Sequence, residues 1–317
     1  MIRVAVVGAG SFGREHARVY SEIADCKLVA VCDVDQTRGR SVAERYSAGY
    51  VGDYRELIGI VDAVSVAAPT ASHQEIACEL LAAGIAALVE KPIARTLEEA
   101  DQIIQASSLG AAVLQVGHLE RFNPAVTAAA SILTQPRFFE GHRLSIFTPR
   151  SLDIDVVMDL MIHDIDVVLA FVNSEVTEVR ASGLPILTPR IDIANARVEF
   201  ANGSVANLTA SRVSAERVRK LRFFQPGQYV SIDYAAQEAA VVSVKTRPEG
   251  RPEFESRLLP VDQAEPLRLE IESFLAAAGG APVKVSGEEG RRALSLAVEV
   301  TEKIREHADR AGVPFPG

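Results

Sequence analysis

Asp159 and His163 lie four residues apart in the segment MDLMIHDIDVVL, so a helix there would carry both side chains on one face. A carboxylate in that position can orient an imidazole and stabilise its cation. The pair therefore predicts a general base at His163 with Asp159 assisting. Asp166, three residues after His163, could take the assisting role instead. The structural alternative is an amphipathic helix with two solvated acids and a core histidine.

Polar residues also follow two apolar runs, 63–69 and 86–90, that are typical of buried strands. The carboxyl ends of parallel strands share one edge of a sheet, where ligands bind. Lys91 could hydrogen-bond a substrate oxygen there and stabilise negative charge as a C–H bond breaks. The alternatives are an ordinary strand end at Lys91, a helix cap at Thr70 and a structural role for His73. The residues expected to border a cofactor at this edge are Pro69, Thr70, His73, Glu90 and Lys91.

The opening segment VVGAGSFG has the spacing of a dinucleotide-binding turn. Its glycines allow a tight turn, a close approach to a pyrophosphate and close packing of helix on strand, while the helix N-terminus supplies amide donors. Asp33 follows 20 residues after the last glycine, where a carboxylate accepts hydrogen bonds from the adenosine ribose and favours NAD. Arg38 leaves NADP possible. The alternative is a glycine turn with a solvated aspartate. The expected cofactor residues are Gly8, Gly10, Ser11, Phe12, Gly13 and Asp33.

Alternating apolar runs and amphipathic stretches in residues 1–120 would position these groups. Runs such as IRVAVVG, KLVAVCD and AVLQVG are typical of strands, and TLEEADQIIQASS begins with a capping-box pattern at Thr96 and Glu99. Strand and helix in alternation predict an α/β fold with an N-terminal Rossmann domain, a doubly wound parallel sheet.

The pattern changes in residues 121–317, which we expect to form a C-terminal α+β domain. A helix near 155–172 precedes several runs with period-two alternation, and Asn202-Gly203 gives a hairpin signal between two of them. These strands predict a large, open, mostly antiparallel sheet, and a last helix over 288–308 closes the chain. One sheet face has no obvious helical cover, so we expect a homodimer or homotetramer joined through this sheet.

Composition argues against several kinds of partner. The 317 residues are 48% hydrophobic and 24% charged, an ordinary globular mixture. A formal net charge of −9 gives no attraction to nucleic acid or to an anionic membrane surface. The three cysteines, at 26, 32 and 78, fit neither zinc-ligand spacing nor a disulfide framework, so no metal site is predicted. No signal-peptide pattern opens the chain, and we expect a cytoplasmic protein.

Five motifs, taken in this order, resemble the Gfo/Idh/MocA oxidoreductases, which are mostly NAD(P)-dependent sugar and inositol dehydrogenases. They are GAGSFGREH, APTASH, EKP, VGHLERFNP and DLMIHDID. The resemblance implies that Lys91 and His163 are the catalytic pair, that Asp159 assists, and that Lys91-Pro92 is a cis peptide. Further segments, including GHLERFNPAV and RVRKLRFFQPGQYVSIDY, resemble the branch that oxidises nucleotide-activated amino sugars, in particular UDP-N-acetylglucosamine at position 3.

We therefore expect an NAD-dependent dehydrogenase that oxidises a secondary hydroxyl of a sugar, one linked to UDP, to a ketone. A basic cluster of Arg212, Arg217, Arg219, Lys220 and Arg222 could hold a diphosphate, or could lie on a solvated strand face or subunit interface. Two alternatives stay open: a dehydrogenase of a free sugar or inositol, and a sensor that binds NAD without turnover. The expected substrate-binding residues are His118, Arg121, Asn123, Arg150 and His163.

Overall fold

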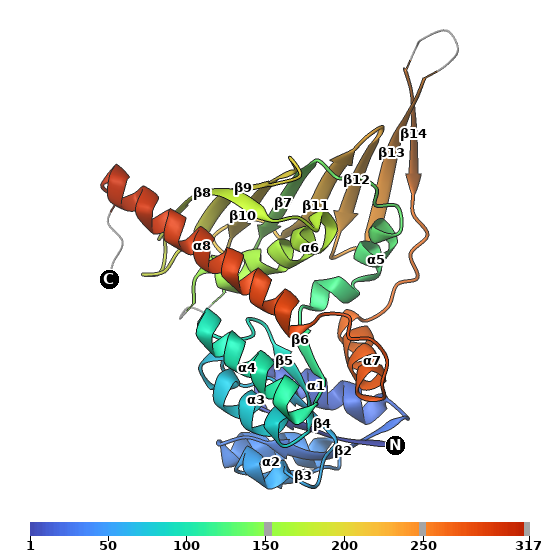
Figure 1. Ribbon diagram of the computed structural model, residues 1–317, viewed down its shortest axis with the longest axis vertical. Helices are drawn as coiled ribbons and strands as arrows, with labels where there is room; N and C mark the ends of the chain where they lie inside the picture. The colour runs from blue at the N-terminus through green and yellow to red at the C-terminus, as the bar shows by residue number, and fades with distance from the viewer. Residues whose placement is uncertain (149–153, 247–251, 314–317) are drawn as a thin grey trace. The chain divides into compact units, whose positions relative to one another are not determined.

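The computed structural model describes residues 1–148, 154–246 and 252–313, and the chain divides into two compact units (Figure 1). The first unit contains Met1–Leu119 and Glu265–Leu294, and the second contains Glu120–Ala264 and Ser295–Gly317. The domains expected from the sequence, 1–120 and 121–317, differ from these units by the segment Glu265–Leu294 and by Glu120 at the first boundary. That segment returns to the first unit because its apolar side chains join the core beneath the parallel sheet.

The first unit is built on a parallel six-stranded sheet with the order β3-β2-β1-β4-β5-β6, as the sequence predicts for a doubly wound fold. The short strand β3 gives no apolar run, so periodicity alone does not reveal it. The strands are β1 (Ile2–Val7), β2 (Cys26–Cys32), β3 (Gly49–Val51), β4 (Ala63–Val66), β5 (Ala86–Glu90) and β6 (Leu114–Gly117).

Helices α1 and α7 bury their apolar faces in one core with strands β1, β2, β4 and β5. Ile271 and Phe274 of α7 are fully buried in it, beside Ala17 and Tyr20 of α1. Thr96 accepts a hydrogen bond from the Glu99 N–H at 3.2 Å, which confirms the predicted cap of α4. The helices of this unit are α1 (Ser11–Glu22), α2 (Gln36–Arg45), η1 (Tyr54–Leu57), η2 (Thr70–Ser72), α3 (His73–Ala82), α4 (Leu97–Gly110) and α7 (Pro266–Ala278).

The second unit is built on an eight-stranded sheet with the order β14-β13-β12-β11-β7-β10-β9-β8, in which only β7 and β10 are parallel neighbours among the described strands. The mostly antiparallel sheet confirms the expected fold class. Gly203, at a φ of +81°, lies in the predicted turn between β9 and β10. The strands are β7 (Phe138–Leu144), β8 (Val176–Leu184), β9 (Ile193–Phe200), β10 (Val205–Ser211), β11 (Val218–Gln225), β12 (Gln228–Asp233), β13 (Glu238–Thr246) and β14 (Pro252–Leu258).

Helices α5 and α6 lie on one face of this sheet, α5 against β12 and β13, and α6 against β7 and β10 (Figure 1). The opposite face carries polar and charged side chains at alternate positions of β7, β9 and β11. The other helical elements are η3 (Leu119–Phe122), α5 (Pro124–Ala130), the π-helical turn η4 (Val157–Met161), α6 (Ile162–Val172) and α8 (Gly287–Ala311), which runs through both units.

Candidate functional site

The turn between β1 and α1 has the backbone that a dinucleotide site requires. Gly8 has a φ of +97°, and a Cβ there would lie 2.6 Å from the Ala67 carbonyl oxygen. A Cβ on Gly13 would lie 1.8 Å from the Gly8 carbonyl oxygen, so the strand and helix approach too closely for any side chain. Both positions require glycine.

Gly10 is the N-cap of α1, and no side chain caps this helix. A Cβ on Gly10 would meet no atom within 4 Å, so the space before the helix N-terminus is open. The first N–H groups of a helix have no partner within the helix and carry a partial positive charge. Ser11 and Phe12, the first residues of α1, are exposed there. These features fit the pyrophosphate of a dinucleotide.

Asp33, at the end of β2, is almost completely buried and accepts four hydrogen bonds. Its Oδ2 accepts from the Ala9 N–H at 2.7 Å, and its Oδ1 accepts from the Asp35 N–H at 2.8 Å. Arg38 donates to both oxygens, at 3.0 and 2.7 Å. Burial opposes ionisation, but Arg38 and the two N–H groups outweigh it and hold the pKa of Asp33 below its ordinary value. Asp33 is therefore ionised and ties the glycine turn to β2.

The end of β5 is held by buried hydrogen bonds. Glu90 is 8% exposed, and its Oε2 accepts from the Lys91 N–H at 3.3 Å. Lys91 is half-buried, and the Lys91-Pro92 peptide bond is cis, as the resemblance implies. The ring nitrogens of His73 face the carbonyl oxygens of Pro92 at 3.1 Å and Ala68 at 2.8 Å. His73 is 1% exposed, so its buried ring supports the two segments that follow β4 and β5.

The other residues expected at this edge differ in exposure. Thr70 begins η2 and is half-buried, and Pro69 before it is exposed. Neither Thr70 nor Ser72 caps α3, because its N-cap, Ser72, makes no side-chain cap bond. His118, which follows β6, is 1% exposed.

Asp159 and His163 lie on consecutive turns, as expected, but the helix begins with a π turn. Asp159 belongs to η4 and His163 to the first turn of α6, and both are half-buried. Hydrogen bonds in a π turn run from i to i+5, so four residues fall just short of a full turn and the two side chains still share one side. Asp155 accepts from the Ile191 N–H at 3.0 Å and anchors the start of this helix.

A buried ionic network lies next to His163 in the second unit. Arg143 of β7 donates two hydrogen bonds to Asp164, at 3.0 and 3.1 Å, and one to Glu120 at 2.9 Å. The Tyr234 ring lies 4.8 Å from the guanidinium carbon. Burial opposes the charge of Arg143, but the two carboxylates raise its pKa above the ordinary value. The network ties α6 to β7 and to the segment that contains Glu120.

The substrate candidates of the second unit have partners within the protein. Arg121 donates to Oδ1 of Asp166 at 3.4 Å. The Asn123 amide donates to Glu120 and to the Tyr234 carbonyl, and its oxygen caps α5 through the Ala125 N–H. These bonds link the Asn123 side chain to η3, to the end of β12 and to the start of α5. Arg150 lies outside the described residues.

Members of the basic cluster considered for a diphosphate take part in several separate ion pairs. Lys220 lies 3.3 Å from Asp233, Arg222 lies 3.9 Å from Glu140, and the buried Arg212 lies 3.7 Å from Asp192. The side chains of residues 217, 219 and 220 are exposed. This arrangement favours the sheet-face reading of the cluster over a diphosphate site.

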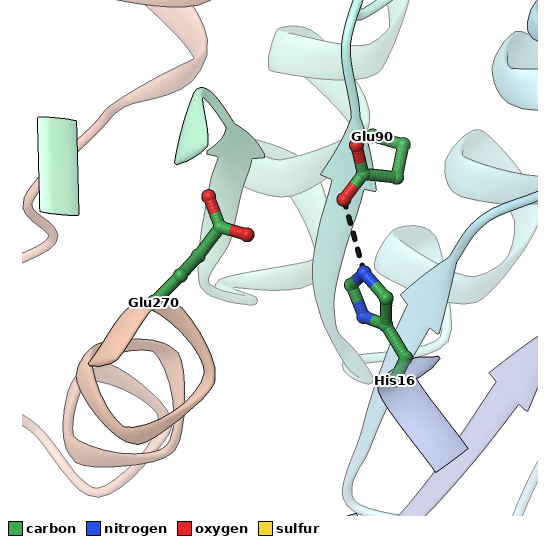
Figure 2. Close-up of side chains that lie close together, drawn as sticks. All are labelled: His16, Glu90 and Glu270. Carbon is green, nitrogen blue, oxygen red and sulfur yellow. Dashed lines mark hydrogen bonds and ion pairs between the residues drawn. The ribbon is translucent and has the colours of Figure 1, made fainter. Parts of the chain in front are cut away.

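One group of side chains that the sequence analysis did not consider could hold a cation. Donor atoms of His16, Glu90 and Glu270 lie within 4.8 Å of one another, and all three residues are buried (Figure 2). A sequence signal for it exists. His16 occupies a core position of α1 and Glu270 a core position of α7, where an apolar residue is expected.

Comparison with known proteins gives the family. A model described as oxidoreductase family, NAD-binding Rossmann fold, matches residues 2–118, and a GFO/IDH/MocA C-terminal domain model matches residues 97–225. The UDP-N-acetylglucosamine 3-dehydrogenase of Acidithiobacillus ferrooxidans is 37% identical over 313 residues, covering 98% of this chain and 99% of that protein. A solved structure of it has a TM-score of 0.89 at 36% identity, covering 96% of this chain and 98% of that one.

An inositol 2-dehydrogenase of Rhizobium meliloti is 28% identical over 329 residues, covering 96% of this chain and 97% of that protein. None of the helices in the described part of the chain has the length and apolar character needed to cross a membrane.

Both family models and a full-length relative above 30% identity agree with the motifs of the sequence. The chain belongs to the GFO/IDH/MocA family of NAD-binding oxidoreductases.

Proposed function

We propose that this protein is an NAD-dependent dehydrogenase that oxidises the 3-hydroxyl of UDP-N-acetylglucosamine, or of a closely related UDP-linked amino sugar, to a ketone. The observation that carries the proposal is the similarity, over nearly the whole of both chains, to an enzyme of that name. The glycine turn, the ionised Asp33 and the open space before α1 support NAD as the cofactor.

The proposed chemistry assigns one step to each of three side chains. His163 removes the proton of the substrate hydroxyl as general base. The Lys91 ammonium donates a hydrogen bond to the same oxygen and stabilises its developing negative charge. Asp159 orients the imidazole of His163. NAD, when bound, accepts the hydride that leaves the carbon.

We further propose a division of labour between the two parts of the chain. The Rossmann part, expected at 1–120, binds NAD through Gly8, Gly10, Gly13 and Asp33. The part expected at 121–317 binds the sugar. Arg121 and His163 of this part, with His118 just before it, line the sugar site. Asn123 supports it through its bonds to Glu120 and Tyr234.

A second candidate function is oxidation of inositol or a free sugar, because the inositol 2-dehydrogenase of R. meliloti also matches nearly the whole chain. The test is to incubate the purified protein with NAD and a panel of UDP-sugars, free sugars and inositols, and to follow NADH by absorbance. Reduction of NAD with UDP-N-acetylglucosamine alone supports the proposal. Turnover restricted to free polyols selects the second candidate, and NAD binding without turnover of any sugar selects the sensor.

We also propose a homodimer or homotetramer joined through the uncovered face of the eight-stranded sheet. Strand register places Phe138, Phe224 and Tyr229 side by side on that face, with ring centroids 5.9 and 5.0 Å apart. Such a row of aromatic rings is an apolar strip that a second copy could bury. Light scattering should give a dimer or larger, and Phe224→Glu should dissociate it. A monomeric wild-type protein at micromolar concentration would contradict the proposal.

The cytoplasmic location stays a prediction. All three cysteines are free thiols, and burial raises the pKa of Cys26 to about 11 and that of Cys32 to about 12. Buried, protonated thiols of this kind are ordinary in a reducing compartment.

A further inference from the structure

The guanidinium group of Arg143 joins two segments of the second unit that the proposed function uses. Arg143 follows Phe139 and Gly141 at alternate positions of β7, and all three are buried on the helix-covered side of the eight-stranded sheet. Only 3% of Arg143 is exposed. A cation buried this deeply is costly unless it is paired, so its partners decide what it does.

One link runs from Arg143 to α6. Its Nε and Nη2 donate to the two carboxylate oxygens of Asp164 at 3.0 and 3.1 Å. Two parallel bonds from a planar guanidinium to one carboxylate fix its direction as well as its distance. Asp164 directly follows His163 in the first turn of α6, and a Cβ at Gly141 would touch the Asp164 Cβ at 3.6 Å. This link therefore fixes the helical turn that carries His163 against β7.

The other link runs from Arg143 to η3. The Nη1 atom of Arg143 donates to Glu120 Oε1 at 2.9 Å, and Glu120 Oε2 accepts from the Asn123 amide at 3.1 Å. Glu120 directly precedes Arg121 in this four-residue turn. Hydrogen bonds within a 3₁₀ turn have poorer geometry than those of an α-helix, so side-chain bonds contribute much to its placement. This link therefore fixes the turn that carries Arg121.

Tyr234, which follows β12, covers the guanidinium. Its ring lies 4.8 Å from the guanidinium carbon, and Tyr234 is 4% exposed. Burial opposes the charge of Arg143, but Asp164 and Glu120 hold its pKa above the ordinary value, so the guanidinium is charged. Each of its three nitrogens donates a hydrogen bond to one of these two carboxylates. With water excluded, such bonds are stronger and favour a single arrangement.

A second, direct route joins the same two segments. Arg121 donates to Asp166 at 3.4 Å, so consecutive residues of η3 reach α6 in two ways, Glu120 through Arg143 and Arg121 directly. Buried ionic groups are not needed to hold a helix on a sheet, because apolar residues of similar volume often do so as well or better. What a fully bonded ionic network gives is one arrangement of the groups that it joins. Here it joins the turn with the proposed base to the turn with a proposed sugar-binding arginine.

We propose that Arg143 is a positioning residue for the reaction, with a separate task for each of its two links. The link to Asp164 holds His163 against the sugar hydroxyl, and the link to Glu120 holds Arg121 against the sugar. The inference rests on the proposed roles of His163 and Arg121. A displaced base slows the reaction after binding, so the Asp164 link acts on kcat. A sugar contact made alike before and during the reaction acts on KM, so the Glu120 link acts there.

The first experiment measures kcat and KM with the sugar that the wild-type enzyme oxidises. Asp164→Asn should lower kcat by roughly 10-fold to 100-fold with little change in KM. Glu120→Gln should raise KM by roughly 10-fold with little change in kcat. Arg143→Lys should change both, because one ammonium cannot supply the paired bonds and the third bond together. The control is Val241→Ala, which is fully buried in the same sheet but separated from β7 by β12 and β11.

Val241→Ala should lower the free energy of unfolding and leave both kinetic parameters near wild type. Kinetics are measured at a temperature where denaturant unfolding shows each variant to be folded. If Arg143→Lys does not fold, Asp164→Asn and Glu120→Gln carry the test, since each keeps one link. Unchanged kcat in Asp164→Asn, or the same change of kcat and KM in both single-link variants, would overturn the proposal.

The second experiment needs no substrate. Amide hydrogen exchange of the full-length protein is followed by mass spectrometry over residues 119–123 and 160–168. Exchange should be faster by about 10-fold in 160–168 alone for Asp164→Asn, in 119–123 alone for Glu120→Gln, and in both for Arg143→Lys. Equal loosening of both segments by either single-link variant would contradict two separate links. If wild type oxidises no sugar, the proposed function fails, while the exchange pattern still decides whether the links act separately.

Discussion

Replacing Asp33 by serine should abolish the preference of this protein for NAD over NADP, or invert it. In wild type the Asp33 carboxylate is ionised, and its hydrogen-bonding capacity is taken by Ala9, Asp35 and Arg38. The ribose hydroxyls of NAD must therefore share this carboxylate with Arg38 or displace it. Binding of NAD therefore exchanges hydrogen bonds at Asp33 and does not simply add one. The gain in binding free energy is smaller than the roughly 1.5–3 kcal/mol expected for a new hydrogen bond to a charged group.

A 2′-phosphate would meet both a carboxylate and a guanidinium. A unit charge about 4 Å from a carboxylate costs about 4 kcal/mol at an effective dielectric constant of 20. Arg38, with a side chain 48% exposed, offsets part of this cost, and solvent screens its contribution. We expect wild type to favour NAD by roughly 10-fold to 100-fold, a difference of about 1.4–2.8 kcal/mol. Asp33→Ser removes the repulsion, leaves Arg38 to meet the phosphate, and should shift the ratio toward NADP by roughly 100-fold.

The assay is the Kd of NAD and of NADP by fluorescence quenching, for wild type, Asp33→Ser, Arg38→Leu and the double variant. Arg38→Leu should weaken NADP by about 10-fold and change NAD little, and the double variant should lose most of the gain for NADP. Asp33→Ser also removes the acceptor of two backbone N–H groups, so its unfolding free energy should be measured beside its Kd values. Equal binding of both cofactors by wild type, or an unchanged ratio in Asp33→Ser, would refute the reasoning.

Three further predictions concern activity and stability. Lys91→Ala and His163→Ala should each lower kcat by roughly 10²–10⁴-fold, and Asp159→Asn by less; near-normal turnover of the His163 variant would place the base elsewhere. Arg143→Met leaves two buried carboxylates without their cation, so denaturant unfolding should give a loss of about 3–5 kcal/mol; a loss below about 1 kcal/mol would mean that the network adds little. Burial lowers the pKa of His73 in the folded protein. As the pH falls below about 6.5, His73 therefore binds a proton in the unfolded chain before it does so in the folded protein, and the free energy of unfolding decreases. His73→Gln should lose this part of the pH dependence; an unchanged slope would mean that His73 titrates alike in both states.

Periodicity predicts the long elements of this chain because one face of each is apolar. The hairpin at Asn202-Gly203, the helix over 287–311 and five strands of the parallel sheet follow from residues adjacent in sequence. Strand β7 escapes prediction because Glu140 and His142 alternate with Gly141, and so no apolar run marks it. Helix α7 is not among the predicted elements, and its place in the first unit depends on the core that its apolar side chains join.

In the candidate site too, features set by residues close in sequence could be predicted, and contacts between residues far apart in sequence could not. The glycine turn could be predicted with its reasons, because the close approaches of Gly8 and Gly13 arise within one strand–turn–helix unit. The partners of Asp33 and Glu90 could not all be predicted from the sequence. His16 of α1, for example, reaches Glu90 only when the strands of the parallel sheet have paired and α1 has packed against them. The local pattern does show where a charged residue occupies a position at which an apolar one is expected. Glu270 lies in the apolar stripe of Leu267, Ile271 and Phe274, where burial of an unpaired charge would be costly. A polar residue on the buried stripe of a helix therefore predicts that a partner exists, and only the fold identifies the partner.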